Sequence, residues 1–429
     1  MTQEIQSVRG MNDVLPAEIG AWQRFEAVTR ELLGCYGYEE IRVPVLERTE
    51  LFKRAIGEHT DVVGKEMYTF TDRGGDSLTL RPEATAGIVR ALISNRMLRG
   101  QRHKLWCLGP MFRHEAPQAG RYRQFWQVDV EAVGCPGPDV DAELIALSAR
   151  LWQRLGIAGL KLEINSLGTP ESRRSYRARL VDYLRAHEGE LDADSRRRLE
   201  GNPLRILDSK NPELQALIAG APLLTEYLDA ESREHFEALG RMLDGAGVTY
   251  SINPRLVRGL DYYNRTVFEW ITAASGAQNA VCSGGRYDGL IALLGGEATP
   301  AVGFAMGVER LVALLVAAGG TPAVAHPDVY VVVSGERALT QALTIVERLR
   351  TERPRLRFEL NLGGGNFKAQ FRRADKSGAP LALIIGDDEL ARGVLGVKPL
   401  RVESGQSECP IETLAAGVDA ALAALGGMG

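Results

Sequence analysis

The sequence predicts an α+β chain with two domains, residues 1–322 and 323–429. At 429 residues it is long enough to build more than one hydrophobic core. Residues 109–131 show the period-two pattern of two strands joined by a turn. Beyond residue 327, strand-like runs alternate with helical ones, which is typical of a small α/β domain with a parallel or mixed sheet.

An amphipathic helix is predicted near the start of the chain. Apolar residues recur at helical spacing over residues 19–32, and Gly34 and Gly37 end the pattern. The next stretch, YEEIRVPVLE, predicts a strand that Pro44 interrupts, which favours an edge, a bulge or an interface strand over the centre of a sheet. DSLTL predicts a further strand, and Pro82 suits the first turn of the helix after it.

The hairpin at residues 109–131 has one apolar face and one polar face. Its second strand places Phe125, Gln127, Asp129 and Glu131 on one face and Trp126, Val128 and Val130 on the other. In the first strand, Arg113 and Glu115 share a face. Burial of so many ionisable groups is unfavourable unless a ligand pairs with them. The polar face is therefore a candidate binding surface, with a solvated hairpin as the alternative.

A helical insertion is predicted at about residues 171–245, where charged helical stretches flank the segment GNPLRILDSKNPE. Strand patterns return after it, with a turn or bulge at Gly259 and a strand from about Thr266. The helical spacing of Val308, Leu311, Val312 and Leu315 then predicts a helix.

Residues 319–327, GGTPAVAHP, have the composition of a linker. In the domain beyond it, GGGN predicts a turn that leads into a helix, because the glycine and lysine spacing of a phosphate loop is missing. Residues 348–376 contain nine Lys or Arg and three Asp or Glu, a local charge of +6. That charge suits docking of nucleic acid, and a solvated charged helix is the alternative.

Composition narrows the class of protein. The apolar share of 45% and the charged share of 25% are ordinary values for a soluble chain. We expect no signal peptide and no membrane span, since the longest apolar run, near Leu311, is about eight residues where a span needs roughly 20. The five cysteines form no CxxC pair and the six histidines no HExxH, so we expect no protein metal site, no disulfides and a cytoplasmic location.

Three further groups of residues are candidate ligand contacts. Arg310 falls in the first turn of its helix, where it and the free N–H groups would favour an anion such as phosphate; a pair with Glu309 is the alternative. Glu83 lies near a helix start, a position that stabilises an acid whether or not it binds a ligand. Arg258, Tyr262 and Tyr263 gather on a turn and suit an anion beside a planar or amine-bearing group; an aromatic strand end is the alternative.

The order of these motifs resembles the class II aminoacyl-tRNA synthetases, and the histidyl-tRNA synthetase family in particular. GYEEIRVPVLE resembles motif 1, FRHE with GRYRQFWQ resembles motif 2, and GFAMGVERL resembles motif 3. LVRGLDYYNRTVFEW and SGGRYDGL are similar to the two signature peptides of that family, and GMNDVLP and LTLRPE also resemble it. The resemblance extends over essentially the whole chain.

The resemblance implies an antiparallel sheet flanked by helices that dimerises through motif 1, with a helical insertion and a C-terminal α/β anticodon-binding domain. The implied activity is ATP-dependent activation of L-histidine to its adenylate, followed by transfer to the 3′ end of histidine tRNA. Mg²⁺ would accompany ATP on its phosphates and not occupy a site of the protein.

The resemblance also implies roles for single residues. The catalytic residues would be Arg113, Arg258 and Arg310. Histidine would be bound by Glu83, Ala84, Thr85, Arg113, Gln127, Glu131, Arg258, Tyr262, Tyr263 and Tyr287. ATP would be bound by Arg113, Glu115, Arg121, Phe125 and Arg310. Within these sets, Arg113 and Arg258 would contact the α-phosphate and Arg310 the γ-phosphate, while Glu131 and Tyr263 would read the imidazole.

Two residues depart from the family pattern. Ala116 stands where the bacterial family usually has Arg, and Trp126 stands where it usually has His. Trp126 shares the parity of Val128, so we expect it to point away from the ligand. Ala116 and Gln118 belong to the loop that would meet the tRNA acceptor end, so we hypothesise altered reading of that end.

Three other functions are considered. A synthetase-like regulatory subunit of the ATP phosphoribosyltransferase of histidine biosynthesis typically lacks LVRGLDYY and the anticodon domain, and this chain has both. A synthetase for another amino acid would not call for the acid and phenol of Glu131 and Tyr263. A pure tRNA-binding module would not need the arginines that face phosphate.

Overall fold

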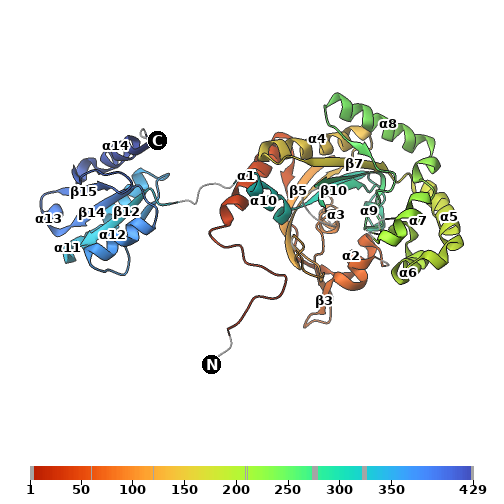
Figure 1. Cartoon of the computed structure of the whole chain (residues 1–429), viewed down its shortest axis with the longest axis horizontal. Helices are drawn as coiled ribbons and strands as arrows, with labels where there is room; N and C mark the ends of the chain where they lie inside the picture. The colour runs from red at the N-terminus through yellow and green to blue at the C-terminus, as the bar shows by residue number, and fades with distance from the viewer. Residues whose placement is uncertain are drawn as a thin grey trace. The chain divides into compact units, whose positions relative to one another are not determined.

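The chain forms two compact units, residues 1–322 and 323–429, each described here by itself (Figure 1). The computed structural model describes residues 4–58, 60–118, 120–207, 209, 211–272, 279–320 and 326–426. Most of the predicted linker, residues 321–325, lies outside the described residues. Among those that are described, no helix combines the length and the apolar character needed to cross a bilayer.

An eight-stranded sheet organises the described part of the first unit. In spatial order its strands are β1 (Glu39–Glu40), β5 (His103–Phe112), β6 (Gln124–Val133), β11 (Ala301–Gly307), β10 (Ala280–Arg286), β9 (Asn264–Thr272), β7 (Leu160–Ser166) and β8 (Ser251–Ile252). The strands from β5 to β7 pair antiparallel, while β1 and β8 add parallel edges. The predicted hairpin is β5–β6, but β5 ends at Phe112, so Arg113 and Glu115 lie in the loop after it and not in the strand. The single strand predicted for YEEIRVPVLE was wrong: Glu39–Glu40 form the edge strand β1, and Leu46–Arg48, beyond Pro44, belong to a different sheet.

One face of this sheet is covered by helices (Figure 1). They are α1 (Ile19–Cys35), α4 (Pro138–Leu155), α8 (Ala230–Gly245) and α10 (Val308–Ala317). The four apolar residues predicted for α10 are all buried. Trp126 lies on this helix side, where its ring meets that of Trp22 edge-on at 6.3 Å between centroids, so the predicted direction of Trp126 is confirmed.

The opposite face carries smaller elements. They are β2 (Leu46–Arg48), β3 (Tyr68–Thr71) and β4 (Ser77–Leu80) in a separate three-stranded sheet, the helices α2 (Thr49–Ile56), α3 (Thr85–Ser94) and α9 (Leu290–Leu293), and the short π-helix η1 (Val62–Glu66). The predicted start of α3 was wrong, because Pro82 precedes the helix, which begins at Thr85. The carboxylate of Glu83 accepts a 2.9 Å hydrogen bond from the N–H of Ala86 and so caps this helix.

The helical insertion leaves the sheet after β7 and returns at β8. Its helices are α5 (Pro170–Ala186), α6 (Ala193–Gly201), α7 (Gln215–Gly220) and α8, joined by 3-10 turns at Glu188–Glu190, Pro203–Ile206, Pro212–Leu214 and Leu224–Tyr227. Because β7 and β8 are neighbouring strands, with Glu163 opposite Ser251, both ends of the insertion start from one edge of the sheet.

The second unit is an α/β domain with a mixed five-stranded sheet, in the order β13-β12-β14-β15-β16. Its elements are β12 (Val329–Ser334), α11 (Glu336–Glu352), β13 (Phe358–Leu360), α12 (Phe367–Lys376), β14 (Leu381–Gly386), α13 (Asp387–Ala391), β15 (Val394–Pro399), β16 (Ser407–Pro410), the 3-10 turn Ile411–Thr413 and α14 (Leu414–Gly426). The glycines before α12 do form the turn that leads into it, since Asn366 caps the helix by accepting from the N–H of Ala369 at 2.9 Å.

Candidate active site

A cavity of about 500 Å³ lies on the face of the large sheet that α1 and α10 leave uncovered. It is lined by most of the residues that the sequence predicted: Glu83, Thr85, Arg113, Glu115, Arg121, Phe125, Gln127, Glu131, Arg258, Tyr262, Tyr263, Tyr287 and Arg310. Ala84, Ala116 and Gln118 are not part of its wall. Ala84 is fully buried beside Glu83 and Thr85, while Ala116 and Gln118 are exposed on the β5–β6 loop.

Strand β6 gives the cavity its length and two chemically different ends. Phe125 and Glu131 are six residues apart on the same face of the strand, a separation of about 20 Å. Arginines gather around Phe125, and carboxyl groups gather around Glu131. The cavity can therefore hold an elongated ligand with anionic groups at one end and hydrogen-bond donors at the other.

Glu131 anchors the acidic end. Its Oε1 accepts a 2.6 Å hydrogen bond from the hydroxyl of Thr85, and its Oε2 accepts one from the hydroxyl of Tyr287. Burial raises the pKa of Glu131 to about 8, an effect that these two hydrogen bonds only partly oppose. The carboxyl group is thus fixed in direction and ready to pair with a donor that enters the cavity.

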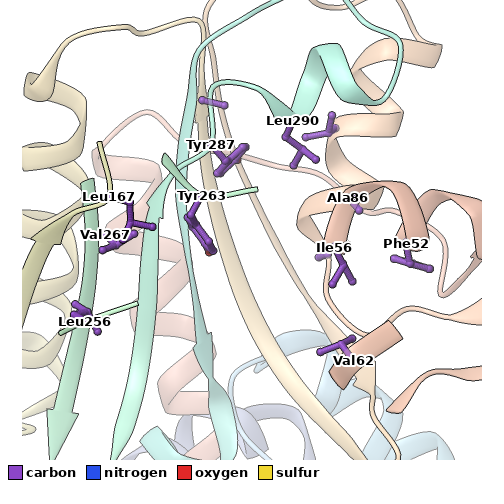
Figure 2. Close-up of a cluster of buried hydrophobic side chains, with 14 of the residues drawn as sticks. Phe52, Ile56, Val62, Ala86, Leu167, Leu256, Tyr263, Val267, Tyr287 and Leu290 are labelled. Atoms are coloured by element: carbon purple, nitrogen blue, oxygen red, sulfur yellow. The ribbon is translucent and has the colours of Figure 1, made fainter. Parts of the chain in front are cut away.

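Three tyrosine rings stand beside Glu131. The ring centroids of Tyr262 and Tyr263 are 4.6 Å apart, and that of Tyr287 lies 5.5 Å from Tyr262 and 6.4 Å from Tyr263. Figure 2 shows Tyr263 and Tyr287 next to buried apolar residues such as Leu290. Strand parity alone would separate Tyr262 from Tyr263, but the chain is a turn there and both rings line the cavity, as the glycine at 259 suggested.

Several acceptors near Glu131 have no hydrogen-bond partner among the described residues. They are Oε2 of Glu83, Oε1 of Gln127 and both carboxylate oxygens of Asp129. Burial, followed by the nearby Glu83, raises the pKa of Asp129 to about 8. Asp129 was placed on the polar face by sequence but not among the ligand contacts, although its parity with Gln127 and Glu131 gave that signal. Unpaired buried acceptors are costly, so this end calls for a donor such as an ammonium group.

The basic end joins the β5–β6 hairpin to α10. The guanidinium of Arg113 lies 5.3 Å from the ring centroid of Phe125, and its Nε donates to the carbonyl of Pro82 at 2.9 Å. Arg121 forms an ion pair with Glu115. The Nε of Arg310 donates to the carbonyl of Gly120 at 2.9 Å. Burial and the neighbouring arginines lower the pKa of both Arg121 and Arg310, which shows positive charge concentrated here.

Arg258 lies on the wall that the turn before β9 contributes. Its Nη1 donates to Glu269 at 3.0 Å, and its guanidinium is 5.5 Å from the ring centroid of Tyr263. Its Nε is buried without a partner among the described residues. Arg258 therefore retains a donor for a further acceptor. Together with Arg113, Arg121 and Arg310 in the same cavity, Arg258 can bind a polyphosphate through charge-assisted hydrogen bonds.

Glu309 has a structural contact that the sequence did not reveal. Its carboxylate oxygens accept from the backbone N–H of Trp126 at 2.8 and 3.1 Å, and burial raises its pKa to about 7. This acid in the first turn of α10 thus joins α10 to strand β6. Asp61, Arg198 and Arg205 also line the cavity unpredicted, the last two from the helical insertion.

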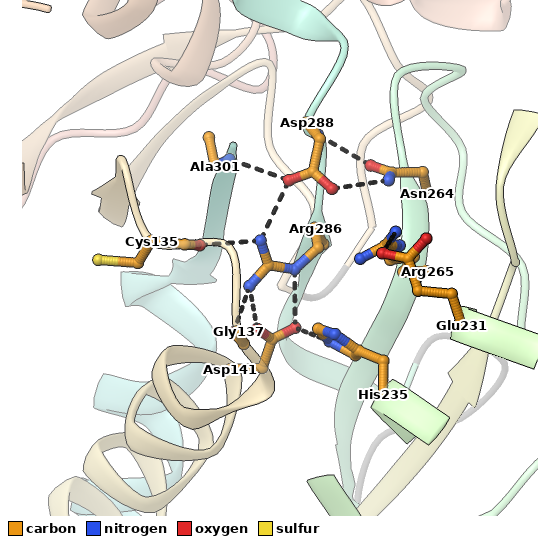
Figure 3. A network of polar contacts seen from close by, with 10 residues as sticks. All are labelled: Cys135, Gly137, Asp141, Glu231, His235, Asn264, Arg265, Arg286, Asp288 and Ala301. Carbon is orange, nitrogen blue, oxygen red and sulfur yellow. Dashed lines mark hydrogen bonds and ion pairs between the residues drawn. The ribbon is translucent and has the colours of Figure 1, made fainter. Parts of the chain in front are cut away.

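Arg286, the residue before Tyr287, forms a buried ion pair with Asp141 (Figure 3). Arg286 donates to both carboxylate oxygens of Asp141 and, at 3.1 Å, to Asp288. His235 from α8 approaches the same Asp141 at 3.5 Å. Since Arg286 and Asp141 are both fully buried, they fix the backbone from which Tyr287 reaches Glu131.

Among the residues that the structure describes, no three His, Cys, Asp or Glu side chains lie close enough together to hold a metal ion.

Comparison with known proteins gives this arrangement its family. Residues 10–311 match the family model described as Histidyl-tRNA synthetase, and residues 328–420 match one described as Anticodon binding domain. The chain belongs to the histidyl-tRNA synthetase family. The expected α+β class II fold, with its antiparallel sheet, helical insertion and anticodon-binding domain, is confirmed.

Solved structures of this family agree. The apo histidyl-tRNA synthetase of S. aureus is 35% identical, with a TM-score of 0.81, over 97% of this chain and all of its own. The histidyl-tRNA synthetase of Nostoc is 21% identical, with a TM-score of 0.67, over 98% of this chain and all of its own. A Bacillus halodurans protein described as an ATP phosphoribosyltransferase regulatory subunit/histidyl-tRNA synthetase is 22% identical, with a TM-score of 0.65, over 90% of this chain and 99% of its own. The last two share the fold.

Proposed function

We propose that this member of the histidyl-tRNA synthetase family is an active histidine–tRNA ligase. It would activate L-histidine with ATP and transfer the histidyl group to the 3′ end of histidine tRNA, acting as a homodimer. The observation that carries the proposal is Glu131, held by Thr85 and Tyr287 at the acidic end of a cavity whose other end is basic.

The acidic end suits histidine. An imidazole ring offers two nitrogens, for which the carboxyl group of Glu131 and the phenol of Tyr263 are apt partners. The α-ammonium group would satisfy the unpaired oxygens of Glu83, Gln127 and Asp129. A site built on such hydrogen bonds discriminates strongly against side chains that lack them, by about 10⁴-fold in favourable cases.

The basic end suits the triphosphate of ATP. A histidine carboxylate oxygen would attack the α-phosphorus, forming a P–O bond as the bond to the departing pyrophosphate breaks. Arg113 and Arg258 would stabilise the charge on the α-phosphate, and Arg310 would bind the γ-phosphate. Glu115, Arg121 and Phe125 would contact the nucleotide. In the second step, a hydroxyl of the terminal tRNA ribose would attack the carbonyl carbon and release AMP.

The test is ATP–pyrophosphate exchange with each of the standard amino acids in turn. We expect exchange with histidine alone, and its loss in Arg113→Ala. A matched control is Arg154→Ala, because Arg154 lies on α4 away from the cavity, paired with Glu31 at 2.9 Å. Exchange with a different amino acid would refute the assignment of substrate.

A second candidate function is that of a regulatory subunit of ATP phosphoribosyltransferase, the role by which the B. halodurans protein is also described. Absence of exchange with every amino acid, together with binding to an ATP phosphoribosyltransferase, would favour it. The full set of cavity arginines argues for the catalytic role instead.

A further inference from the structure

The turn between β8 and β9, residues 253–263, carries Arg258, Tyr262 and Tyr263 but has no regular secondary structure. Its described internal backbone hydrogen bond runs from the N–H of Leu256 to the carbonyl of Asn253. Such a segment cannot hold three side chains in place by its own backbone. The contacts that fix it must come from neighbouring elements.

Arg173 of the helical insertion supplies one set of these contacts. From α5, its Nη2 donates to the carbonyl of Tyr263 at 2.6 Å and its Nη1 to the carbonyl of Asp261 at 3.3 Å. Burial lowers the pKa of Arg173, with Asp261 acting in the opposite direction. One guanidinium thus holds the backbone on both sides of Tyr262.

Arg255 makes the reverse connection, from the turn to the insertion. Its Nη1 donates to the carbonyl of Pro222 at 2.9 Å. Its Nη2 donates to the carbonyls of Ala219 and Ala221 at 3.0 and 2.6 Å. These carbonyls lie at the C-terminal end of α7, which attracts a cation. Arginines therefore cross between turn and insertion in both directions.

Asp261 completes the attachment. Its side chain accepts from the Nδ2 of Asn202, at the end of α6, at 2.7 Å. Its backbone N–H donates to the carbonyl of Ile56 at 3.3 Å. On that side Gly57 lies so close that a Cβ there would collide with the Asp261 carboxylate. The turn is thereby clamped between α2 and three separate parts of the insertion.

We infer that Arg173 and Arg255 are positioning residues for the reaction, and that the helical insertion sets the place of Arg258, Tyr262 and Tyr263. The identity of the ligand rests on the proposed function, whereas the attachment itself does not. A small displacement of reacting groups can cost about 10²-fold in rate, so loosening this attachment has a measurable effect on activation of the amino acid.

The decisive variant is Arg173→Gln, with Arg174→Gln as its matched control. Arg174 is the next residue of the same helix, its side chain is 74% exposed, and its ion pair with Glu171 is long at 4.0 Å. In histidine-dependent exchange, we expect Arg173→Gln to raise KM for histidine and to lower kcat. The ratio kcat/KM should fall by about 10-fold or more. KM for ATP should change less than KM for histidine, because Arg258 is the one proposed phosphate contact on this turn, while Arg113, Arg121 and Arg310 lie on other elements. Arg173→Lys keeps the charge and can reach one carbonyl, so its kcat/KM for histidine should lie between those of wild type and Arg173→Gln.

Deuterium uptake of residues 256–263 gives a readout that does not depend on the substrate. We expect faster uptake there in Arg173→Gln and Arg255→Gln than in Arg174→Gln, with the β5–β6 strands unchanged. Equal uptake and equal kinetics in Arg173→Gln and Arg174→Gln would overturn the inference. If Arg173→Gln does not fold, the same comparison is made with Arg173→Lys. A wild type without exchange on any amino acid would defeat the proposed function, and deuterium uptake would still decide the role of the insertion.

Discussion

Gly303 lies directly opposite Glu131 in the β6–β11 ladder, and a Cβ atom at position 303 would overlap the carboxylate of Glu131. The absence of a side chain at position 303 of β11 is thus what leaves room for the acid at the acidic end of the cavity. Under the proposed function, recognition of histidine would therefore depend on a residue that supplies no functional group.

Gly303→Ala should consequently displace Glu131 and weaken its bonds with Thr85 and Tyr287. We expect kcat/KM for histidine to fall by about 10²-fold in the exchange assay, as for a shift of roughly 1 Å at a reacting site. Gly289→Ala is the control, because a Cβ at that exposed glycine meets nothing within 4 Å. Equal kcat/KM values for the two variants would contradict this explanation.

Asp129→Asn should alter the pH dependence of stability. The pKa of Asp129 is about 8 in the folded chain against an ordinary 3.8, so the folded state retains a proton that the unfolded state loses. This contribution to stability is fully present below the ordinary pKa and is lost as pH rises toward about 8. Thermal melts of the ligand-free protein from about pH 5 to pH 8 should show a steeper fall for wild type than for Asp129→Asn.

An exposed acid provides the comparison for this measurement. Asp139→Asn changes a carboxylate at the start of α4 and should melt with the pH profile of wild type. A wild-type melting temperature that stays level over this range would rule out a proton held by Asp129.

Asp141→Ala should destabilise the chain by about 3–5 kcal/mol, because it leaves the fully buried Arg286 without its principal anion. Urea unfolding would measure the loss. The double variant Asp141→Ala with Arg286→Met should recover part of it, since the unpaired charge is then removed. Asp139→Ala, in the same helical turn, is the control. If Asp139→Ala lowers the free energy of unfolding as much as Asp141→Ala does, the buried ion pair is not the cause of the loss.

Ala116→Arg should change how the acceptor end of the tRNA is read while leaving amino acid activation intact. Ala116 is exposed on the β5–β6 loop and does not line the cavity, so ATP–pyrophosphate exchange should be unaffected. Charging of histidine tRNA variants altered at the terminal base pair should distinguish Ala116→Arg from wild type. Identical discrimination by both proteins would end the hypothesis.

Residue parity predicted the part of the candidate site that β6 contributes. Period two separated Trp126 from Gln127 and Glu131, and the structure places them on opposite faces of β6. That inference succeeds because a strand fixes the direction of each side chain. The prediction of where α3 starts failed, because Pro82 precedes the helix instead of opening it. The N–H of Ala86 in the first turn is instead satisfied by the side chain of Glu83.

Contacts between segments far apart in the chain could not be predicted from the sequence. The bond of Tyr287 to Glu131 joins residues 156 positions apart, and that of Glu309 to Trp126 joins residues 183 apart. Arg198 and Arg205 reach the cavity from an insertion whose path is set by tertiary packing. No local pattern encodes such meetings, because they depend on how whole elements pack.

Every described residue that lines the cavity falls between Asp61 and Arg310, within the first unit. A gene truncated after that unit would still encode all of these lining residues. The anticodon-binding domain, residues 328–420, can therefore change in sequence without altering any of them.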